Sequence, residues 1–267
     1  MTKKAGKSSE KRKANGKKTE KMSKPSLVNK ELSEKYPHDY FDDRIKTALT
    51  LITPQKNAKY LDIGCSNGKV ATWVAEKIQT KDIHGIDIAN IEDARKNNVK
   101  AVFFDLNEDN KLPYKDKAFD VLTCFDTLEH IYNTDHCVRE IKRVLKDNGY
   151  AVIIVPRTDS LINIILLALG YQMMSGGCSL ERNYGNFSDN RISAHMAHFT
   201  KRDLIKMFEF YGFRIEEYRE ASTIGAWLGD QAALGHKVNP IKKIIFKAYQ
   251  LIPFKKEASI IKVRKMK

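Results

Sequence analysis

Three aspartates and a glycine turn are the residues of this 267-residue chain that could do chemistry together. Asp62, Asp87 and Asp105 each stand at or just after the end of a short apolar stretch, and Gly64 and Gly68 follow the first. Such a turn lets the backbone approach a ligand, and the helix after it offers unpaired N–H groups. Asp87 follows Gly68 by 19 residues, near the offset at which a carboxylate accepts two ribose hydroxyls. Each aspartate alone reads as a turn former, but the three together favour a nucleoside site.

A parallel sheet would bring these residues to one edge, and the hydrophobic pattern predicts such a sheet. Apolar stretches predict strands at 60–63, 83–88, 100–104, 119–125, 150–155, 213–218 and 258–263. Amphipathic patterns predict helices at 41–52, 67–78, 91–98, around 138–145, where Gly149 would form a left-handed cap, and from the capping box at Thr200 to Tyr211. Strands that alternate with helices predict an α/β fold with a doubly wound, mostly parallel seven-stranded sheet. Ligands of such sheets bind at the carboxyl ends of the strands.

The net charge of +14 is concentrated at the two ends of the chain. Residues 1–24 hold ten Lys/Arg against two Glu, and residues 237–267 hold ten against one, so the stretch between them carries −3. We expect residues 1–24 to be a disordered basic tail, either simply solvated or serving as a nuclear signal or polyanion-binding arm. Residues 25–267 would form the domain, with a core at 58–220, a lid insertion at 157–199, and a basic helix and last strand at 237–267.

Cysteine usage and hydropathy predict a reduced, cytoplasmic protein. The four cysteines show no paired spacing, the N-terminus has no apolar leader segment, and no metal is expected. The apolar run 161–169 is shorter than the ~20 residues that span a bilayer. This run and the basic amphipathic stretch 240–252 could contact a membrane surface, although helices of their own domain are the favoured interpretation.

The identity of the nucleoside ligand follows from the charge around the turn. The dinucleotide fingerprint G-x-G-x-x-G is absent, because the turn reads Gly64-Cys-Ser-Asn-Gly68. Asp62 stands just before the turn, and its charge would repel a pyrophosphate. A ligand with an ammonium group and no phosphate fits better, and S-adenosylmethionine has this character.

The order and spacing of several loose motifs resemble those of one protein family. The chain resembles the class I S-adenosylmethionine-dependent methyltransferases of the type-11 group over residues 58–220. The matching segments are Leu61–Gly68, Gly85–Ile88, Phe104–Leu106, Leu112–Tyr114, Phe119–Leu122, Leu128–Ile131, Glu140–Leu145, Gly149, His198–Leu204 and Tyr211–Phe213. Ser66 departs from the family, which usually has a glycine there.

The resemblance implies S-adenosylmethionine as cofactor, and it implies roles for residues along the sheet edge. Asp62 would help to place the ammonium group, Asp87 would accept the ribose hydroxyls, and Asp105 would bond the adenine amino group. The full set of implied cofactor-binding residues is Asp62, Gly64, Ser66, Gly68, Asp87, Ile88, Asp105, Leu106 and Phe125.

A proton acceptor near the methyl group is the second requirement of such an enzyme, and histidine fits near neutral pH. His130 follows the strand 119–125, and His195 and His198 lie in the lid insertion. His130 and His195 are therefore the candidate catalytic residues. Packing or helix capping is the competing interpretation of His130.

The sequence also narrows the methyl acceptor. The segment Cys124–His130 lacks the Asp/Asn-Pro-Pro-aromatic and Pro-Cys motifs of base methyltransferases, and the near-neutral body lacks a dense basic face. We therefore expect a hydroxyl or carboxyl of a small molecule (a sugar, a quinone-type phenol or another metabolite, free or lipid-linked). Two alternatives stay open. One is an RNA methyltransferase with basic arms, and the other is a non-catalytic binding module on the same fold.

Overall fold

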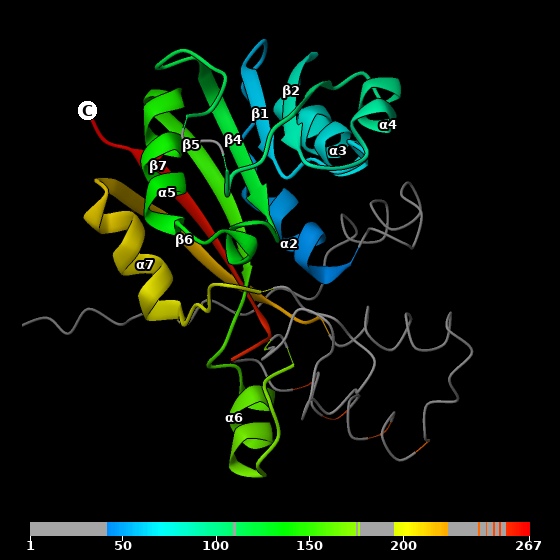
Figure 1. Cartoon of the computed structure of the whole chain (residues 1–267), viewed down its shortest axis with the longest axis vertical. Coiled ribbons are helices and arrows are strands. Elements are labelled where there is room, and N and C mark those ends of the chain that lie inside the picture. Colours follow the sequence, from blue (N-terminus) through cyan, green and yellow to red (C-terminus); the bar gives the residue numbers. More distant parts are fainter. Residues whose placement is uncertain are drawn as a thin grey trace, which may run out of the picture.

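The computed structural model describes residues 42–108, 111–174, 176, 195–223, 240, 244, 248, 251 and 255–267. Within them, one seven-stranded sheet has the strand order β3-β2-β1-β4-β5-β7-β6 (Figure 1). The strands are β1 (Lys59–Ile63), β2 (Asp82–Asp87), β3 (Lys100–Phe103), β4 (Phe119–Phe125), β5 (Leu145–Pro156), β6 (Phe213–Ala221) and β7 (Ala258–Lys265). The predicted α/β fold with a mostly parallel sheet is confirmed.

The sheet reverses its strand order between β1 and β4, where the candidate ligand edge lies. β1 pairs in parallel with β2 on one side and with β4 on the other, and β2 pairs in parallel with β3. β7, between β5 and β6, is the one strand of this sheet that runs opposite to the others. Because β1, β2, β3 and β4 are parallel, their carboxyl ends meet at one edge.

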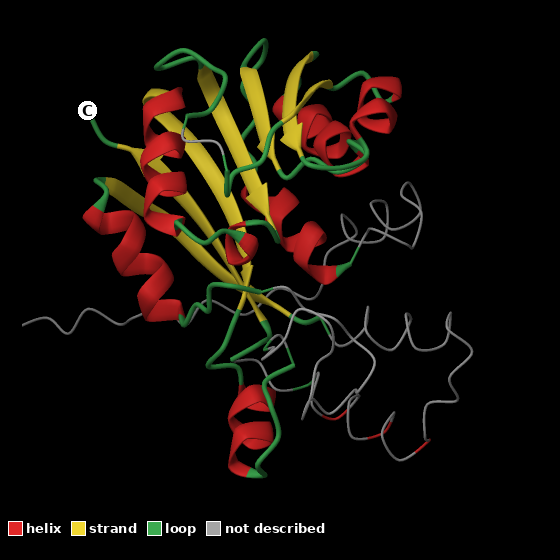
Figure 2. Cartoon of the chain, viewed as in Figure 1, coloured by secondary structure: helices red, strands yellow, loops and turns green. Residues whose placement is uncertain are grey.

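Helices cover both faces of the sheet (Figure 2). The α-helices with bounds in the structure are α2 (Asp43–Leu51), α3 (Lys69–Ile78), α4 (Ile91–Lys96), α5 (Thr134–Val144), α6 (Leu161–Ala168) and α7 (Lys201–Phe210), and a short 3-10 helix, η1 (Leu128–His130), lies in the loop after β4. One apolar cluster joins the sheet to α2, α3 and α4, and a second joins it to α5 and α7. The strand residues alternate between these clusters: Tyr60 belongs to the first, and Leu61 and Ile63 belong to the second.

The start of α7 agrees with the sequence prediction, whereas the end of α5 does not. Thr200 and Asp203 form the predicted capping box of α7. The predicted left-handed cap at Gly149 is wrong, because α5 ends at Val144 and the positive φ of 62° belongs to Asn148. A Cβ on Gly149 would lie 3.0 Å from the Asp120 carbonyl oxygen, so close backbone approach explains the glycine.

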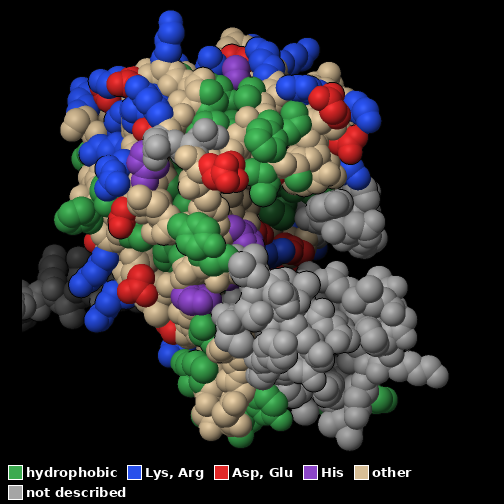
Figure 3. Space-filling model, viewed as in Figure 1, with side chains coloured by type: hydrophobic (Ala, Val, Ile, Leu, Met, Phe, Trp, Pro, Cys, Tyr) green, Lys and Arg blue, Asp and Glu red, His purple; other side chains and the backbone are tan. Residues whose placement is uncertain are grey.

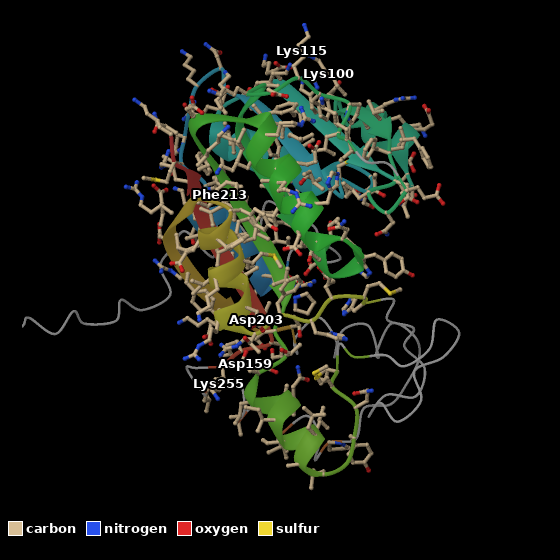
Figure 4. The ribbon with its side chains drawn as sticks, turned by 60° about the vertical axis from the view of Figure 1, so that its left-hand side comes forward. Lys100, Lys115, Asp159, Asp203, Phe213 and Lys255 are labelled. Atoms are coloured by element: carbon tan, nitrogen blue, oxygen red, sulfur yellow. The ribbon has the colours of Figure 1, made fainter. Side chains whose placement is uncertain are left out.

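The described part of the predicted lid insertion contains α6, which projects away from the sheet (Figure 1). Ser160 caps this helix, and the Leu161 N–H donates to the Lys255 carbonyl oxygen at 3.0 Å. Asp159, Asp203 and Lys255 gather at the base of α6 (Figure 4). Buried Arg157 pairs there with Asp159 and Glu220, so the base of the projection is held by charge pairs.

Some predictions fall outside the described residues, among them the basic tail at 1–24, the stretch 177–194 of the insertion, and most of the basic helix near 241–251. The predicted last strand is confirmed as β7. No helix among the described residues is long and apolar enough to span a bilayer. The cysteines that the structure describes, Cys65, Cys124 and Cys137, are buried and free.

Candidate functional site

The turn after β1 is built around a close contact with the loop that follows β4. Gly64 and Gly68 have φ values of 79° and 77°, in the left-handed region that favours glycine. The N–H groups of Gly64 and Cys65 both donate to the Ile86 carbonyl oxygen, at 2.9 and 3.1 Å. A Cβ on Gly64 would overlap the hydroxyl oxygen of Thr127. Only glycine therefore allows the two loops to meet.

Ser66, the departure from the family pattern, supports the carboxylate at the end of β2. Its backbone N–H donates to Asp87 Oδ2 at 2.7 Å, and Asn90 Nδ2 donates to its hydroxyl at 3.3 Å. Asp87 Oδ1 accepts the Ala89 N–H at 2.9 Å. Ser66 has a φ of 44°, which a glycine would adopt at lower cost. These bonds orient the Asp87 carboxylate and leave it partly exposed at the edge.

Asp62 is buried at the end of β1, and its charge has no cationic partner among the groups that set its pKa. Its Oδ1 accepts the Thr123 hydroxyl at 2.5 Å, and the Thr123 and Tyr60 hydroxyls also lie 2.5 Å apart. Burial raises the pKa of Asp62 to about 7, and the negative charge of Asp87 adds to the rise. A cation beside Asp62 would therefore stabilise the charged form of its carboxyl group.

The third aspartate lies where β3 ends. Asp105 Oδ1 accepts the Asn107 N–H at 2.8 Å, and Asn107 Nδ2 donates to the His130 carbonyl oxygen at 3.1 Å. Asn107 Oδ1 in turn accepts the Tyr132 N–H at 2.8 Å. Asn107 thus fastens the loop after β4 to the segment after β3.

Apolar side chains at this edge have the exposure that a bound ring would need. Ile88 is 60 % exposed directly after Asp87, and Leu106 and Phe125 are half-buried. Leu106 packs against the core cluster of α5 and α7, whereas Phe125 packs against that of α2 and α3. The structure therefore brings the nine predicted cofactor-binding residues to one edge of the sheet.

The loop after β4 carries a partly buried charge cluster that the sequence analysis did not anticipate. Arg44 of α2 donates to Asp126 Oδ2 at 2.6 Å and also pairs with Asp42. Burial raises the pKa of Asp126, and Arg44 opposes that rise. Burial raises the pKa of Glu129 well above its usual range, and the nearby charge of Asp126 raises it further.

The two candidate catalytic histidines meet beside this cluster. The ring centroids of His130 and His195 lie 4.7 Å apart in an edge-to-face arrangement. Glu129 holds the segment of His195 in place, because its carbonyl oxygen accepts the N–H groups of Met196 and Ala197 at 2.7 and 3.0 Å. His198 is exposed and is not part of this group. Histidine side chains reach the surface on the face shown in Figure 3.

Sequence reasoning missed Arg44, Asp126 and Glu129. The pattern Asp-x-x-Glu-His directly after an apolar strand was the available signal for the two carboxylates. Arg44 gives no local signal, because 82 residues separate it from Asp126.

Comparison with known proteins identifies the class of this fold and site. The seven-stranded, mostly parallel sheet is that of a class I methyltransferase fold. A family model described as a methyltransferase domain matches residues 33–218, and the chain belongs to that family. The predicted class I methyltransferase is therefore confirmed, and the narrower type-11 grouping stays a prediction.

Two curated relatives and one solved structure are similar to this chain. The methyltransferase GfsG of Streptomyces halstedii is 30% identical over 130 residues, 46% of this chain and 45% of the relative. The 27-O-demethylrifamycin SV methyltransferase of Amycolatopsis mediterranei is 30% identical over 141 residues, 46% and 52% of the two chains. The chain thus spans about half the length of these relatives.

The solved structure is an S-adenosylmethionine-dependent methyltransferase from Mesorhizobium loti. It superposes with a TM-score of 0.52 at 15% identity, covering 82% of this chain and 96% of the other. This similarity supports the fold, and the family supports S-adenosylmethionine as the cofactor.

Proposed function

We propose that this protein transfers the methyl group of S-adenosylmethionine to a hydroxyl or carboxyl oxygen of a small organic molecule. The observation that carries the proposal is the contact between Gly64 and Thr127, which sets the donor edge directly against the loop of His130. The named substrate of the rifamycin relative is a small molecule, which agrees with this choice of acceptor.

The donor side of the site fits S-adenosylmethionine in its charge and its shape. Asp62 is a buried carboxyl with a raised pKa, and a ligand ammonium would stabilise its charged form. Asp87 presents a partly exposed carboxylate to the ribose hydroxyls, and Asp105 would take the adenine amino group. The cofactor supplies a methyl group already activated on a sulfonium, so the protein mainly has to align the acceptor with it.

On the acceptor side, the paired histidines contact the methyl acceptor. An alcohol attacks the methyl group as its oxygen loses a proton, and a histidine within hydrogen-bond reach accepts that proton near neutral pH. His130 is exposed and His195 is half-buried, so the two rings form a wall that a small acceptor can reach. A carboxylate acceptor needs no base, and the same wall would then only position it.

A transfer assay with isotopically labelled S-adenosylmethionine and a cell extract tests the proposal. We expect label in small-molecule products and donor binding by calorimetry. The His130→Ala and His195→Ala variants should lower turnover while the affinity for S-adenosylmethionine stays unchanged. Label that appears only in the RNA fraction, or the absence of donor binding, would overturn the proposed function.

A further inference from the structure

Three side chains with metal-binding atoms converge where β4 and the segment of His195 meet. One ligand atom from each of Glu129, His130 and His195 can be chosen so that all three lie within 4.8 Å of one another. Zinc bonds of about 2.1 Å place tetrahedral ligand atoms about 3.4 Å apart, so binding would require the ligand atoms to approach one another by up to about 1.4 Å. Rotation of the exposed His130 side chain and the half-buried His195 side chain can supply this movement.

A second observation, on Glu129, points to a cation at this cluster. Glu129 is 1 % exposed, and its Oε2 atom is buried without a hydrogen-bond partner. A buried carboxylate oxygen without a partner loses its hydration with no compensating hydrogen bond, which is unfavourable. Buried charges are normally paired or coordinate a metal, and a cation at Glu129 would provide the missing partner.

The set of donors defines the kind of ion. Two imidazole nitrogens and one carboxylate oxygen suit divalent first-row transition metals such as Zn²⁺, whereas Mg²⁺ and Ca²⁺ prefer sites made of oxygen alone. Three protein ligands leave coordination positions for water or substrate. We propose that Glu129, His130 and His195 bind one divalent transition-metal ion beside the methyl-donor edge.

Hydrogen bonds to the backbone hold the segments that carry the three ligands. The Glu129 carbonyl oxygen accepts the N–H groups of Met196 and Ala197, which ties the segment of His195 to the loop of the other two ligands. Asn107 Nδ2 donates to the His130 carbonyl oxygen at 3.1 Å. Backbone bonds of this kind place the side chains before any ion arrives, which reduces the entropy lost on binding.

The role of the ion rests on the proposed function. An acceptor hydroxyl bound to the open position would lose its proton more readily, as metal-bound water does. His130 and His195 would then act as ligands, and the proton would pass to solvent water. The oxygen would be held by the same loop whose Thr127 lies against Gly64 of the glycine turn.

Titration of the chelator-treated, tag-free full chain with Co²⁺, followed by its visible absorption, tests the site directly. We expect one ion per chain, displacement by Zn²⁺, and no displacement by equimolar Mg²⁺. Glu129→Gln and His195→Ala should weaken Co²⁺ binding at least tenfold, since loss of an outer-shell partner alone costs about 10–100-fold. His198→Ala, on the same segment but outside the cluster, should bind Co²⁺ as the parent does.

Calorimetry with S-adenosylmethionine on the same samples separates a lost site from a lost fold. Variants that bind the donor normally but lose Co²⁺ support the site. An unchanged Co²⁺ spectrum in both ligand variants, or a thiolate charge-transfer band, would overturn it. Methyl transfer that continues in a chelator would overturn the metal site and leave the proposed function standing. Metal binding without any methyl transfer would overturn the proposed function and leave the metal site standing.

Discussion

Replacement of Asp62 by asparagine should change how stability depends on pH. The side chain is buried, and burial raises the pKa of its carboxyl from an ordinary 3.8 to about 7. The native state therefore holds a proton between pH 4 and 7 that the unfolded state has released. Stability from this group is complete below pH 4, falls as pH rises, and stops falling above pH 7.

The size of the stability change follows from the pKa shift of Asp62. A shift of about 3 pKa units corresponds to roughly 4 kcal/mol, lost at up to about 1.4 kcal/mol per pH unit. About 2.5 kcal/mol of that loss falls between pH 5 and pH 8. Asp62→Asn keeps an oxygen that can accept the Thr123 hydroxyl but removes the titration. The variant should thus gain about 2.5 kcal/mol on the parent between these pH values.

Urea unfolding of both proteins without ligand, at pH 5, 6, 7 and 8, measures this gain because other titrating groups cancel in the difference. Thr123→Val is the companion variant: it removes a hydrogen bond that lowers the pKa of Asp62, so the loss of stability should extend to higher pH. Parallel curves for the parent and Asp62→Asn from pH 5 to pH 8 would refute the reasoning.

The remaining predictions concern the turn and the ribose carboxylate. Gly64→Ala should destabilise the fold by about 3 kcal/mol or more in urea unfolding, because its Cβ overlaps Thr127. Gly170→Ala has a similar φ of 81° and open space, so it should cost only about 1 kcal/mol, and equal costs would contradict the contact argument. Ser66→Gly should stabilise the turn by up to about 1 kcal/mol and keep donor binding in calorimetry. Asp87→Asn should weaken S-adenosylmethionine binding about tenfold or more, and unchanged affinity would remove the ribose role.

Local signals account for most of the fold. The apolar stretch 119–125 matches β4 at both ends, and the capping box at Thr200 marks the start of α7. The failure at Gly149 has a physical cause: glycine serves close backbone contacts as well as positive φ, and a sequence does not distinguish the two uses. The neighbouring Asn148 took the left-handed conformation instead.

The arrangement of the three aspartates along one sheet edge was predictable because parallel topology alone aligns the ends of β1, β2 and β3. The contacts of the candidate catalytic histidines were not predictable in the same way. His130 and His195 are 65 positions apart in the sequence, and no local pattern predicts that their rings meet. The same is true of Arg44 and Asp126. Long-range contacts that satisfy buried charges depend on the assembled fold, and their partners do not follow from spacing.

The loop after β4 connects the glycine turn to the candidate catalytic histidines. Thr127 lies against Gly64 of the donor turn, and Asn107 bonds the backbone on both sides of Ile131. A displacement of this loop would therefore move the histidines relative to the donor edge. Alignment of reacting groups can supply about 7–11 kcal/mol of a barrier. On the proposed function, rigid attachment of this loop would contribute more to methyl transfer than a strong base, since the sulfonium needs little further activation.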